Sequence, residues 1–500
     1  MSDAALELDL NPDDLAQLIK IPLLTRIGRA AAVTMLWHDT PDGALAARSL
    51  SLSEQRGHWR LEALRPTSSR PWLPGSPAPL VAEGASLPSL HHSLPAGLAP
   101  IAALRGRRLE FAMRSSSPPP NSAGAAAEQE SEAAAEPVRL TVLSGHLRGV
   151  AAEQPTCRVT LQGDAKLLKP LAMELAGAVR LSVPRAGLAA TAAAVARGDV
   201  PAARHAGPAV TMPGLHLTDN AAVLIGQLLD TMLHWSAGAG AGATPVPVHQ
   251  MRVATRRLRS ALTVLKRVAA FPDLMPLSAA LRDTAARLGA ARDWDVFLGG
   301  IAERVGAAFP DDPRLRALFA AARRRRHAAY AELRAHLTGP AFRELEIGLA
   351  CASVLRPWDS ESAPDPRLQQ DTAVFASIAL EHQMKRVRHA GRGLSNLPAE
   401  AMHALRKDCK RLRYTAEFFL PLFPSKPARR FTKQLAALQE ELGALNDGAV
   451  AGGLLAHLGR AERSYAAGLV EGFVAAGALA SRAQIGRAWK RFRKTPTFWS

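Results

Sequence analysis

The spacing of apolar residues predicts strands in the first half of the chain. Apolar and polar residues alternate in short runs such as Leu50–Ser53, Val138–Val142 and Cys157–Leu161. A period of two is typical of strands with one buried face. Two helical segments, near 165–180 and 186–197, close this half. The pattern predicts β structure with a few helices.

From about residue 216 onward the apolar residues recur at helical spacing, which predicts a second, all-helical domain. The Gly-rich stretch 236–247 predicts a flexible joint between the first two helices. Residues 115–137 are of low complexity and predict a disordered insertion in the first half. The expected helices are 218–236, 248–270, 276–298, 313–337, 370–393, 399–420, 428–446 and 461–494. The fold class is therefore α+β, with domains at 1–212 and 216–500.

The helical half contains an internal repeat with an offset of 154 residues. The segment His249–Arg259 (HQMRVATRRLR) reads against His403–Arg413 (HALRKDCKRLR). The same offset carries Leu288–Asp293 (LGAARD) onto Leu442–Asp447 (LGALND). Because two anchors keep one register without a gap, we interpret the half as a duplicated helical unit.

Each repeat begins with a helix that has one cationic face. At 100° per residue, His249, Arg252, Arg256, Arg259 and Lys266 share a face, and the opposite face is apolar. The second copy repeats this stripe from His403 to Arg413. Like charges three or four residues apart repel, and an ordinary solvated face would include acids to relieve this. The pattern favours a phosphate-binding face, because Arg donates two parallel hydrogen bonds to phosphate oxygens. Tyr414 and Glu417 lie beside the stripe and are placed to orient an Arg or Lys.

The charge distribution supports a polyanionic partner for the second half alone. Residues 1–215 contain 21 Lys and Arg against 19 Asp and Glu, whereas residues 216–500 contain 41 against 25. The first half shares the Ala and Arg bias of the chain without the excess charge. A generally basic composition therefore does not explain the second half.

Several classes of protein are disfavoured by composition. No apolar run approaches the roughly 18 residues of a membrane span. The three cysteines, Cys157, Cys351 and Cys409, are far apart and form no CxxC pair, which argues against disulfides and a cysteine-rich zinc site. The N-terminal segment is acidic and lacks the regions of a signal peptide. We expect a cytoplasmic protein with no membrane partner.

The paired motifs of the helical half resemble a CHAD domain over residues 216–500. HxxRxxxRRLR with LGxxRD is followed by HxLRKxxKRLRYxxEFF with LGxLND, and the ending Thr497–Trp499 is also similar to that family's. The resemblance implies two pseudo-symmetric helical bundles, binding of inorganic polyphosphate and association with polyphosphate granules. The predicted polyphosphate-binding residues are His249, Arg252, Arg256, Arg257, Arg259 and Lys266 on the first basic helix, and His403, Arg406, Lys407, Lys410, Arg411, Arg413 and Tyr414 on the second.

Residues 1–212 resemble a degenerate CYTH domain, through Leu8–Pro12 and Asp39–Ala47. The resemblance implies an antiparallel β tunnel that hydrolyses triphosphate with a divalent metal. In that family, an N-terminal ExExK motif supplies carboxylates for the metal and a Lys for phosphate.

The ExExK motif is incomplete in this chain. One register places Asp3, Ala5 and Glu7 at the three positions, and a shift of two gives Ala5, Glu7 and Asp9. Neither register supplies the Lys. Ser53–Gln55 lies where the family has basic ligands, and Cys157–Leu161 has no carboxylate where an acidic strand is expected. Metal-assisted hydrolysis needs both carboxylates and cations, so we expect no catalytic residue, no metal ligand and no cofactor.

The sequence therefore favours non-catalytic binding of polyphosphate. Two alternatives stay open: a metal-dependent inorganic triphosphatase with acids from other strands, and a nucleic-acid-binding protein, since any phosphate polymer is attracted to the basic half. Against nucleic acid, the basic stripes contain only Tyr414 for stacking on bases. Chain-length preference and oligomeric state are left open.

Overall fold

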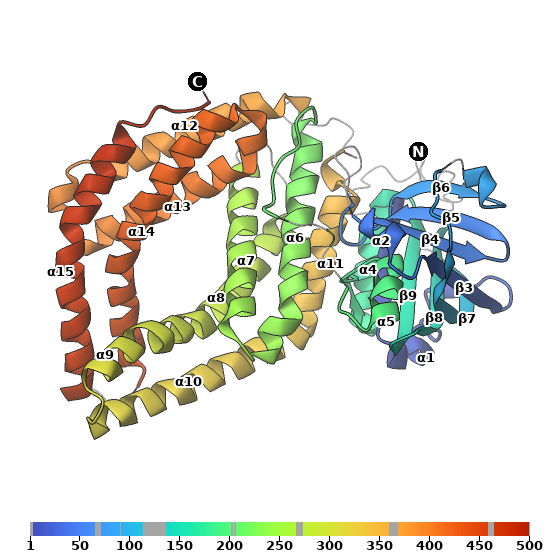
Figure 1. Cartoon of the computed structure of the whole chain (residues 1–500), viewed down its shortest axis with the longest axis horizontal. Helices are drawn as coiled ribbons and strands as arrows, with labels where there is room; N and C mark the ends of the chain where they lie inside the picture. Colours follow the sequence, from blue (N-terminus) through green and yellow to red (C-terminus); the bar gives the residue numbers. More distant parts are fainter. Residues whose placement is uncertain are drawn as a thin grey trace, which may run out of the picture. The chain divides into compact units, whose positions relative to one another are not determined.

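The computed structural model describes residues 4–65, 72–90, 92–113, 137–201, 204, 207–266, 274–359, 369–458 and 465–499. Contacts divide the chain into two compact units. The first, which we call the β unit, comprises 1–207, 225–234 and 339–364. The second, the helical unit, comprises 208–224, 235–338 and 365–500. An antiparallel sheet with helices in one unit and helices alone in the other confirm the α+β class (Figure 1).

The β unit is built on one ten-stranded antiparallel sheet. Its main path runs β10-β1-β9-β8-β7-β3-β4-β5-β6, and β2 pairs with β7. All three strand runs expected from the sequence lie within strands. The strands are β1 (Ala4–Leu10), β2 (Leu24–Arg26), β3 (Ala31–Asp39), β4 (Leu50–Gln55), β5 (His58–Ala63), β6 (Leu80–Gly84), β7 (Ala99–Met113), β8 (Val138–Gly149), β9 (Glu153–Gly163) and β10 (Leu181–Ser182).

The predicted insertion at 115–137 lies, apart from Pro137, outside the described residues. Two short helices, α1 (Leu15–Leu18) and α2 (Ala44–Ala47), lie at strand ends. The Asp39 carboxylate accepts hydrogen bonds from the amides of Thr40, Leu45 and Ala46, and so fixes the turn into α2.

The two faces of the sheet follow from the alternation of β1. Leu6, Leu8 and Leu10 are buried, and α4 (Ala165–Ala178) packs on β1 and β9. Glu7 and Asp9 point to the opposite face, because successive side chains of a strand alternate. The helix α5 (Leu188–Arg197) packs against β7 and β8, where Ala189, Ala192 and Val195 join a buried cluster with Trp37 and Leu104.

One helix of the β unit was not anticipated. The helix α11 (Pro340–Val354) packs on α4, although the sequence analysis placed everything after residue 216 in the helical domain. Buried Glu346 accepts a hydrogen bond from the amide of Val183 at 2.8 Å and lies 3.2 Å from the Arg185 guanidinium. These contacts join α11 to the end of the sheet. The expected domains 1–212 and 216–500 therefore differ from the two units, because residues 225–234 and 339–364 group with the β unit.

The helical unit confirms the long helices expected from the sequence. Some end elsewhere: α14 runs ten residues beyond the predicted end at 446. The π-helical turn η3 and the short α9 were not anticipated. The elements are α6 (Leu217–Ala241), whose middle residues group with the β unit, α7 (Pro245–Leu265), α8 (Leu274–Val296), η3 (Phe297–Ala302), α9 (Glu303–Ala308), α10 (Pro313–Thr338), α12 (Thr372–Ala390), α13 (Ala399–Phe419), α14 (Ser425–Ala456) and α15 (Tyr465–Arg493).

The internal repeat is visible in the helix bounds. Adding 154 to the first and last residues of α7 gives 399 and 419, which are the first and last residues of α13. The same shift brings α6, α8 and α10 to within a few residues of α12, α14 and α15. The neighbour pairs also correspond, since α7 packs on α8 as α13 packs on α14. The helical unit is therefore a duplicated set of four long helices.

The predicted flexible joint at 236–247 is wrong. The helix α6 continues through the glycines to Ala241, and α7 begins at Pro245. A Cβ on Gly238 would lie 2.9 Å from the Pro247 side chain, so glycine permits a close approach of the two helices. Gly242 ends α6 with a φ of +69°, a left-handed conformation that favours glycine. The glycines serve packing and helix termination.

Candidate functional site

The two basic helices are positioned by their apolar faces. In α7, Met251, Leu258 and Leu262 are buried, and Pro245 occupies the first turn, where a missing amide hydrogen costs nothing. In α13, Leu405 and Leu412 are buried in the same way. Burial of these stripes turns the cationic faces outward, as the helical wheel predicts.

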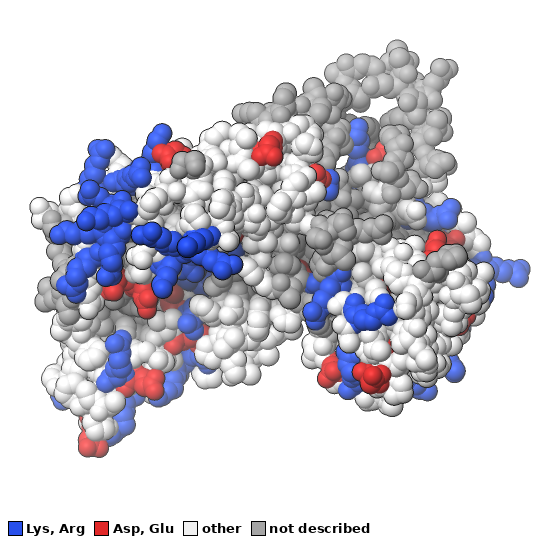
Figure 2. All heavy atoms as spheres, turned by 45° about the horizontal axis from the view of Figure 1, so that its top comes forward, with Lys and Arg blue, Asp and Glu red and all other residues white. Residues whose placement is uncertain are grey.

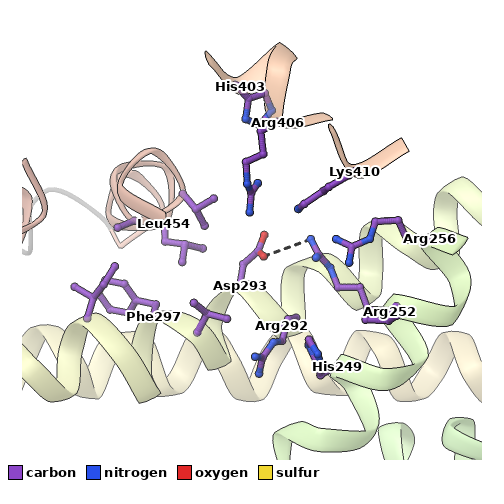
Figure 3. A pocket seen from close by; sticks show the side chains of 15 residues that line it. His249, Arg252, Arg256, Arg292, Asp293, Phe297, His403, Arg406, Lys410 and Leu454 are labelled. Carbon is purple, nitrogen blue, oxygen red and sulfur yellow. Dashed lines mark ion pairs between the residues drawn. The ribbon is translucent and has the colours of Figure 1, made fainter. Parts of the chain in front are cut away.

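The cationic faces of α7 and α13 line two adjoining pockets. The first, of about 580 Å³, we call the cationic pocket: none of its described lining residues is an Asp or Glu, and eight are Lys or Arg. The second, of about 430 Å³, we call the mixed pocket. The Lys and Arg of the cationic pocket are Arg256, Arg259, Lys266, Arg282, Arg406, Lys407, Lys410 and Arg411. The charged residues and histidines of the mixed pocket are His249, Arg252, Arg256, Arg292, Asp293, His403, Arg406 and Lys410 (Figure 3).

The mixed pocket is lined by equivalent residues of the two repeats. The offset of 154 relates His249 to His403, Arg252 to Arg406 and Arg256 to Lys410. In Figure 3, Arg406 and Lys410 approach from α13 while Arg252 and Arg256 approach from α7. Equivalent residues of the two repeats therefore line the same pocket.

Burial and repulsion between neighbouring cations lower the pKa values of several groups in this site. Burial, followed by the neighbouring Arg292, Arg256 and Arg252, lowers the pKa of His249 below its ordinary value. Burial also lowers the pKa of Arg256 and Arg259, and other guanidinium groups add to the effect. The part of this lowering that neighbouring cations cause shows that like charges crowd the site, a repulsion that a bound negative charge would relieve.

Aromatic and acidic neighbours orient some of these cations. The Arg256 guanidinium lies 5.3 Å from the centre of the Tyr414 ring, a cation–π distance. The Glu417 carboxylate accepts a hydrogen bond from Arg413 at 2.7 Å and lies 3.5 Å from Arg257. Tyr414 and Glu417 thus contact arginines of the stripes, as their position on the helical wheel predicts.

Most of the sequence-predicted binding residues come together, and two do not. Arg257 and Arg413 are absent from the described lining of both pockets and share Glu417 instead. Arg257 also lies over the Phe418 ring at 5.5 Å. Arg411 lines the cationic pocket but is paired with Asp408 at 3.0 Å.

The sequence analysis missed residues from α8. Arg282 lines the cationic pocket, and Arg292 and Asp293 line the mixed pocket, where Arg252 lies 3.6 Å from Asp293. Arg292 and Asp293 belong to the LGAARD anchor of the repeat, which was the available signal. The side chains of their counterparts, Asn446 and Asp447, lie outside the described residues.

The surface view shows the same contrast in charge. In Figure 2 the Lys and Arg side chains gather in a broad band on the helical unit, whereas on the β unit they are scattered among acids. The band is the surface expression of the excess of 41 Lys and Arg over 25 Asp and Glu in residues 216–500.

In the β unit, the two carboxylates considered as remnants of a metal site are both paired with one arginine. Arg158 donates to Asp9 at 2.7 Å, to Glu7 at 3.1 Å and to the carbonyl of Ala186 at 3.3 Å. Its side chain is only 7% exposed. Because a guanidinium already lies between the two carboxylates and takes one oxygen of each, a divalent cation there would be repelled by the arginine, and these residues do not fit a divalent metal.

Other features bear on possible chemistry. Among the described residues, no three His, Cys, Asp or Glu side chains form a group suited to a metal ion. The three cysteines are buried and unpaired, and burial raises the pKa of Cys157 to about 11. Within the described part of the chain, no helix meets the length and hydropathy of a membrane span.

The fold and the pockets define a duplicated helical domain with a basic cavity. Residues 223–456 match the family model of the CHAD domain, so the chain contains a CHAD domain, as the repeated motifs indicate. The solved CHAD domain from the plant Ricinus communis is 29% identical, with a TM-score of 0.51, over 59% of this chain and 99% of that one.

A second solved structure is more distant. PptA from Streptomyces chartreusis is 13% identical, with a TM-score of 0.43, over 55% of this chain and 100% of that one. No curated protein matches the chain. The family-model match lies within residues 223–456, and the CYTH-like identity of the β unit stays a prediction.

Proposed function

We propose that the helical unit binds inorganic polyphosphate without chemical conversion. The observation that supports this most directly is the cationic pocket. Its eight Lys and Arg come from α7 with the following Lys266, from α8 and from α13, and no described lining residue is acidic. Arg donates paired hydrogen bonds to phosphate oxygens, and Lys adds point charge. A polymer with one negative charge or more per phosphate matches such an extended cation array.

Polyphosphate suits the site better than nucleic acid. Among the described lining residues of the two pockets, the aromatic ones are Tyr414 and Phe297, and the Tyr414 ring already contacts Arg256. Single-stranded nucleic acids are usually recognised by several aromatic rings that stack on bases. The pockets therefore offer cations for phosphate contacts but lack the several aromatic rings on which successive bases of a nucleic acid stack.

We propose further that the β unit is not catalytic. Its acidic pair Glu7 and Asp9 is engaged by Arg158, and α5 covers the neighbouring face of the sheet. Hydrolysis of triphosphate by a metal requires free oxygen ligands. The same proposal places the protein at polyphosphate granules, where a long polymer is concentrated.

The test is binding of labelled polyphosphate to the full chain at two salt concentrations. We expect binding that weakens steeply with salt, because phosphate contacts release counterions. Excess double-stranded DNA should compete poorly, and incubation of triphosphate with Mg²⁺ or Mn²⁺ should release no phosphate. Binding indifferent to salt, or equal competition by DNA, contradicts the proposal.

A further inference from the structure

The mixed pocket has a wall that a chain of phosphates does not need. Val296 from α8, with Phe297 and Ile301 from the π-helical turn η3, faces Val450, Ala451 and Leu454 from α14. Figure 3 shows Phe297 and Leu454 on one side of the pocket and Arg252, Arg256 and Lys410 on the other. Apolar side chains gain nothing from a charged phosphate, since desolvating a charge is costly.

The apolar wall differs between the two repeats, whereas the cations of the two repeats are equivalent. At the offset of 154, Phe297 corresponds to Ala451, so a ring on one side faces a methyl group on the other. The ring is fixed by edge contacts to Trp294 and Phe319, at centroid distances of 6.0 and 6.5 Å. The apolar wall therefore breaks the symmetry that relates the two sets of cations.

The backbone at this wall is unusual. Residues Phe297–Ala302 form a π-helical turn, whereas α14 continues as a regular α-helix through the equivalent positions. Single π-helical turns are rare and frequently lie at functional sites. The turn places Phe297 and Ile301 on the pocket.

A carboxylate is a further difference between the lining of the mixed pocket and that of the cationic pocket. Asp293 is the acidic residue among the described lining residues, and its side chain is 36% exposed. A carboxylate repels phosphate but accepts hydrogen bonds from hydroxyl and amino groups. It is better suited to the organic part of a ligand than to another phosphate.

We propose that the mixed pocket binds the organic group of a phosphate ester, specifically a nucleoside 5′-polyphosphate. Its phosphates contact Arg256, Arg406 and Lys410, which line both pockets, and its flat base lies against Val296, Phe297 and Leu454. The pocket volume of about 430 Å³ lies in the ordinary range for small ligands. This inference rests on the proposed function, because it uses the same cations.

The test compares two ligands with the same number of phosphates. Displacement of labelled polyphosphate from the full chain is measured with ATP and with inorganic tripolyphosphate, both without metal. Tripolyphosphate has no organic group and at least as much negative charge, so electrostatics alone favours it. We expect ATP to bind at least about fivefold more tightly, which corresponds to about 1 kcal/mol.

Isosteric variants locate the effect. Val296→Thr with Val450→Thr makes the wall polar at constant shape, and should remove most of the preference for ATP while leaving tripolyphosphate within about twofold. Val264→Thr makes the same change in the wall of the cationic pocket and should leave the preference unchanged. Asp293→Asn should weaken ATP binding and strengthen tripolyphosphate binding, because a neutral amide oxygen is a weaker acceptor than a carboxylate and the charge that repels phosphate is removed.

The outcomes separate this inference from the proposed function. If long polyphosphate binds but ATP is no better than tripolyphosphate, the inference is wrong and the proposed function stands. The same conclusion follows if the Val variants weaken both ligands equally. If long polyphosphate does not bind at all, the proposed function is wrong, and the inference loses the cations on which it rests.

Discussion

In the β unit, Arg158 lies between two carboxylates, whereas in the helical unit Arg259 and Lys407 face a pocket without an acidic residue in its described lining. Both units contain many arginines, and both are rich in alanine. What differs is how many acids accompany the arginines and where those acids lie. The total charge of a protein therefore says less about its ligands than the local pairing of its cations.

The largest effect is expected from charge reversal in the cationic pocket. Arg259 and Lys407 are exposed, lie on α7 and α13 respectively, and line that pocket. Arg259→Glu with Lys407→Glu should lower polyphosphate affinity at least about 100-fold, or about 2.7 kcal/mol. Fluorescence anisotropy with labelled polyphosphate measures this.

A matched control changes the same charge elsewhere. Lys20 and Arg29 are exposed residues of the β unit. Lys20→Glu with Arg29→Glu alters the net charge equally and should cost less than about threefold. An equal loss in both variants would show that net charge, and not the pocket, controls binding.

Breaking the pairing in the β unit should affect stability and not binding. Arg158→Met leaves Glu7 and Asp9 without their cation. Removing one partner of a fully buried pair costs roughly 3–5 kcal/mol, and we expect about 2 kcal/mol because the Asp9 side chain is 40% exposed. Hydrogen exchange of the β1 and β9 amides reports the loss of local stability.

Neutralising all three groups provides the control for that variant. Glu7→Gln, Asp9→Asn and Arg158→Met together should recover most of the stability, because no buried charge is left unpaired. Both variants should bind polyphosphate with an affinity within about twofold of that of the natural chain. A large loss of affinity in Arg158→Met would assign the β unit a part in binding.

A moderate effect is expected from pH. Burial and then neighbouring cations lower the pKa of His249 in the free protein, and a bound polyanion raises it again. Binding is therefore linked to proton uptake, so affinity should increase as the pH falls from the pKa of the complex towards the lower pKa of the free protein. Between pH 7.5 and 5.5 we expect a gain of about three- to tenfold.

The variant His249→Gln isolates this contribution. Protonation of the ligand itself is common to both proteins, so only the difference between their pH profiles is informative. The variant should gain less on acidification than the natural chain. Parallel profiles would exclude His249 as the linked group.

The smallest effect is expected at Tyr414. Tyr414→Phe keeps the ring beside Arg256 and removes a hydroxyl whose presence partly offsets the lowering of the Arg256 pKa. We expect a two- to threefold weaker affinity with unchanged salt dependence, measured by the same anisotropy titration. A loss of tenfold or more would mean that the hydroxyl contacts the ligand directly.

These tests use the full chain for a structural reason. A chain beginning at residue 214 would separate residues 225–234 and 339–364 from the sheet and helices of the β unit with which they group. Buried α11 residues such as Leu345 and Ile347 would then lose their partners. Point variants avoid this change.

Much of the helical unit could be predicted from the sequence, since its information is local or repeated. The helical wheel of α7 identified the buried Met251 and Leu258, and the offset of 154 related α7 to α13. The flexible joint was a wrong prediction because Gly238 permits the approach of Pro247, and such a tertiary contact is not visible in composition.

The remaining parts of the site depend on tertiary packing. Arg282, Arg292 and the apolar wall come from α8, η3 and α14, and only the packing of these helices around α7 and α13 brings them to the pockets. Arg413 lies on the predicted stripe, yet Glu417 one turn later engages it. No pattern of spacing alone distinguishes a cation that faces a pocket from one that pairs with an acid.

The most direct test of the account is the stoichiometry of binding by variants of a single basic helix. Arg259→Glu changes only α7, and Lys407→Glu changes only α13. Isothermal titration uses a polyphosphate of defined length near the span from His249 to Lys266, roughly 25 Å at 1.5 Å per residue. The account predicts one ligand per chain, with either variant alone losing at least about tenfold in affinity. Two ligands per natural chain, with each variant losing one and binding the other at full affinity, would contradict the shared site.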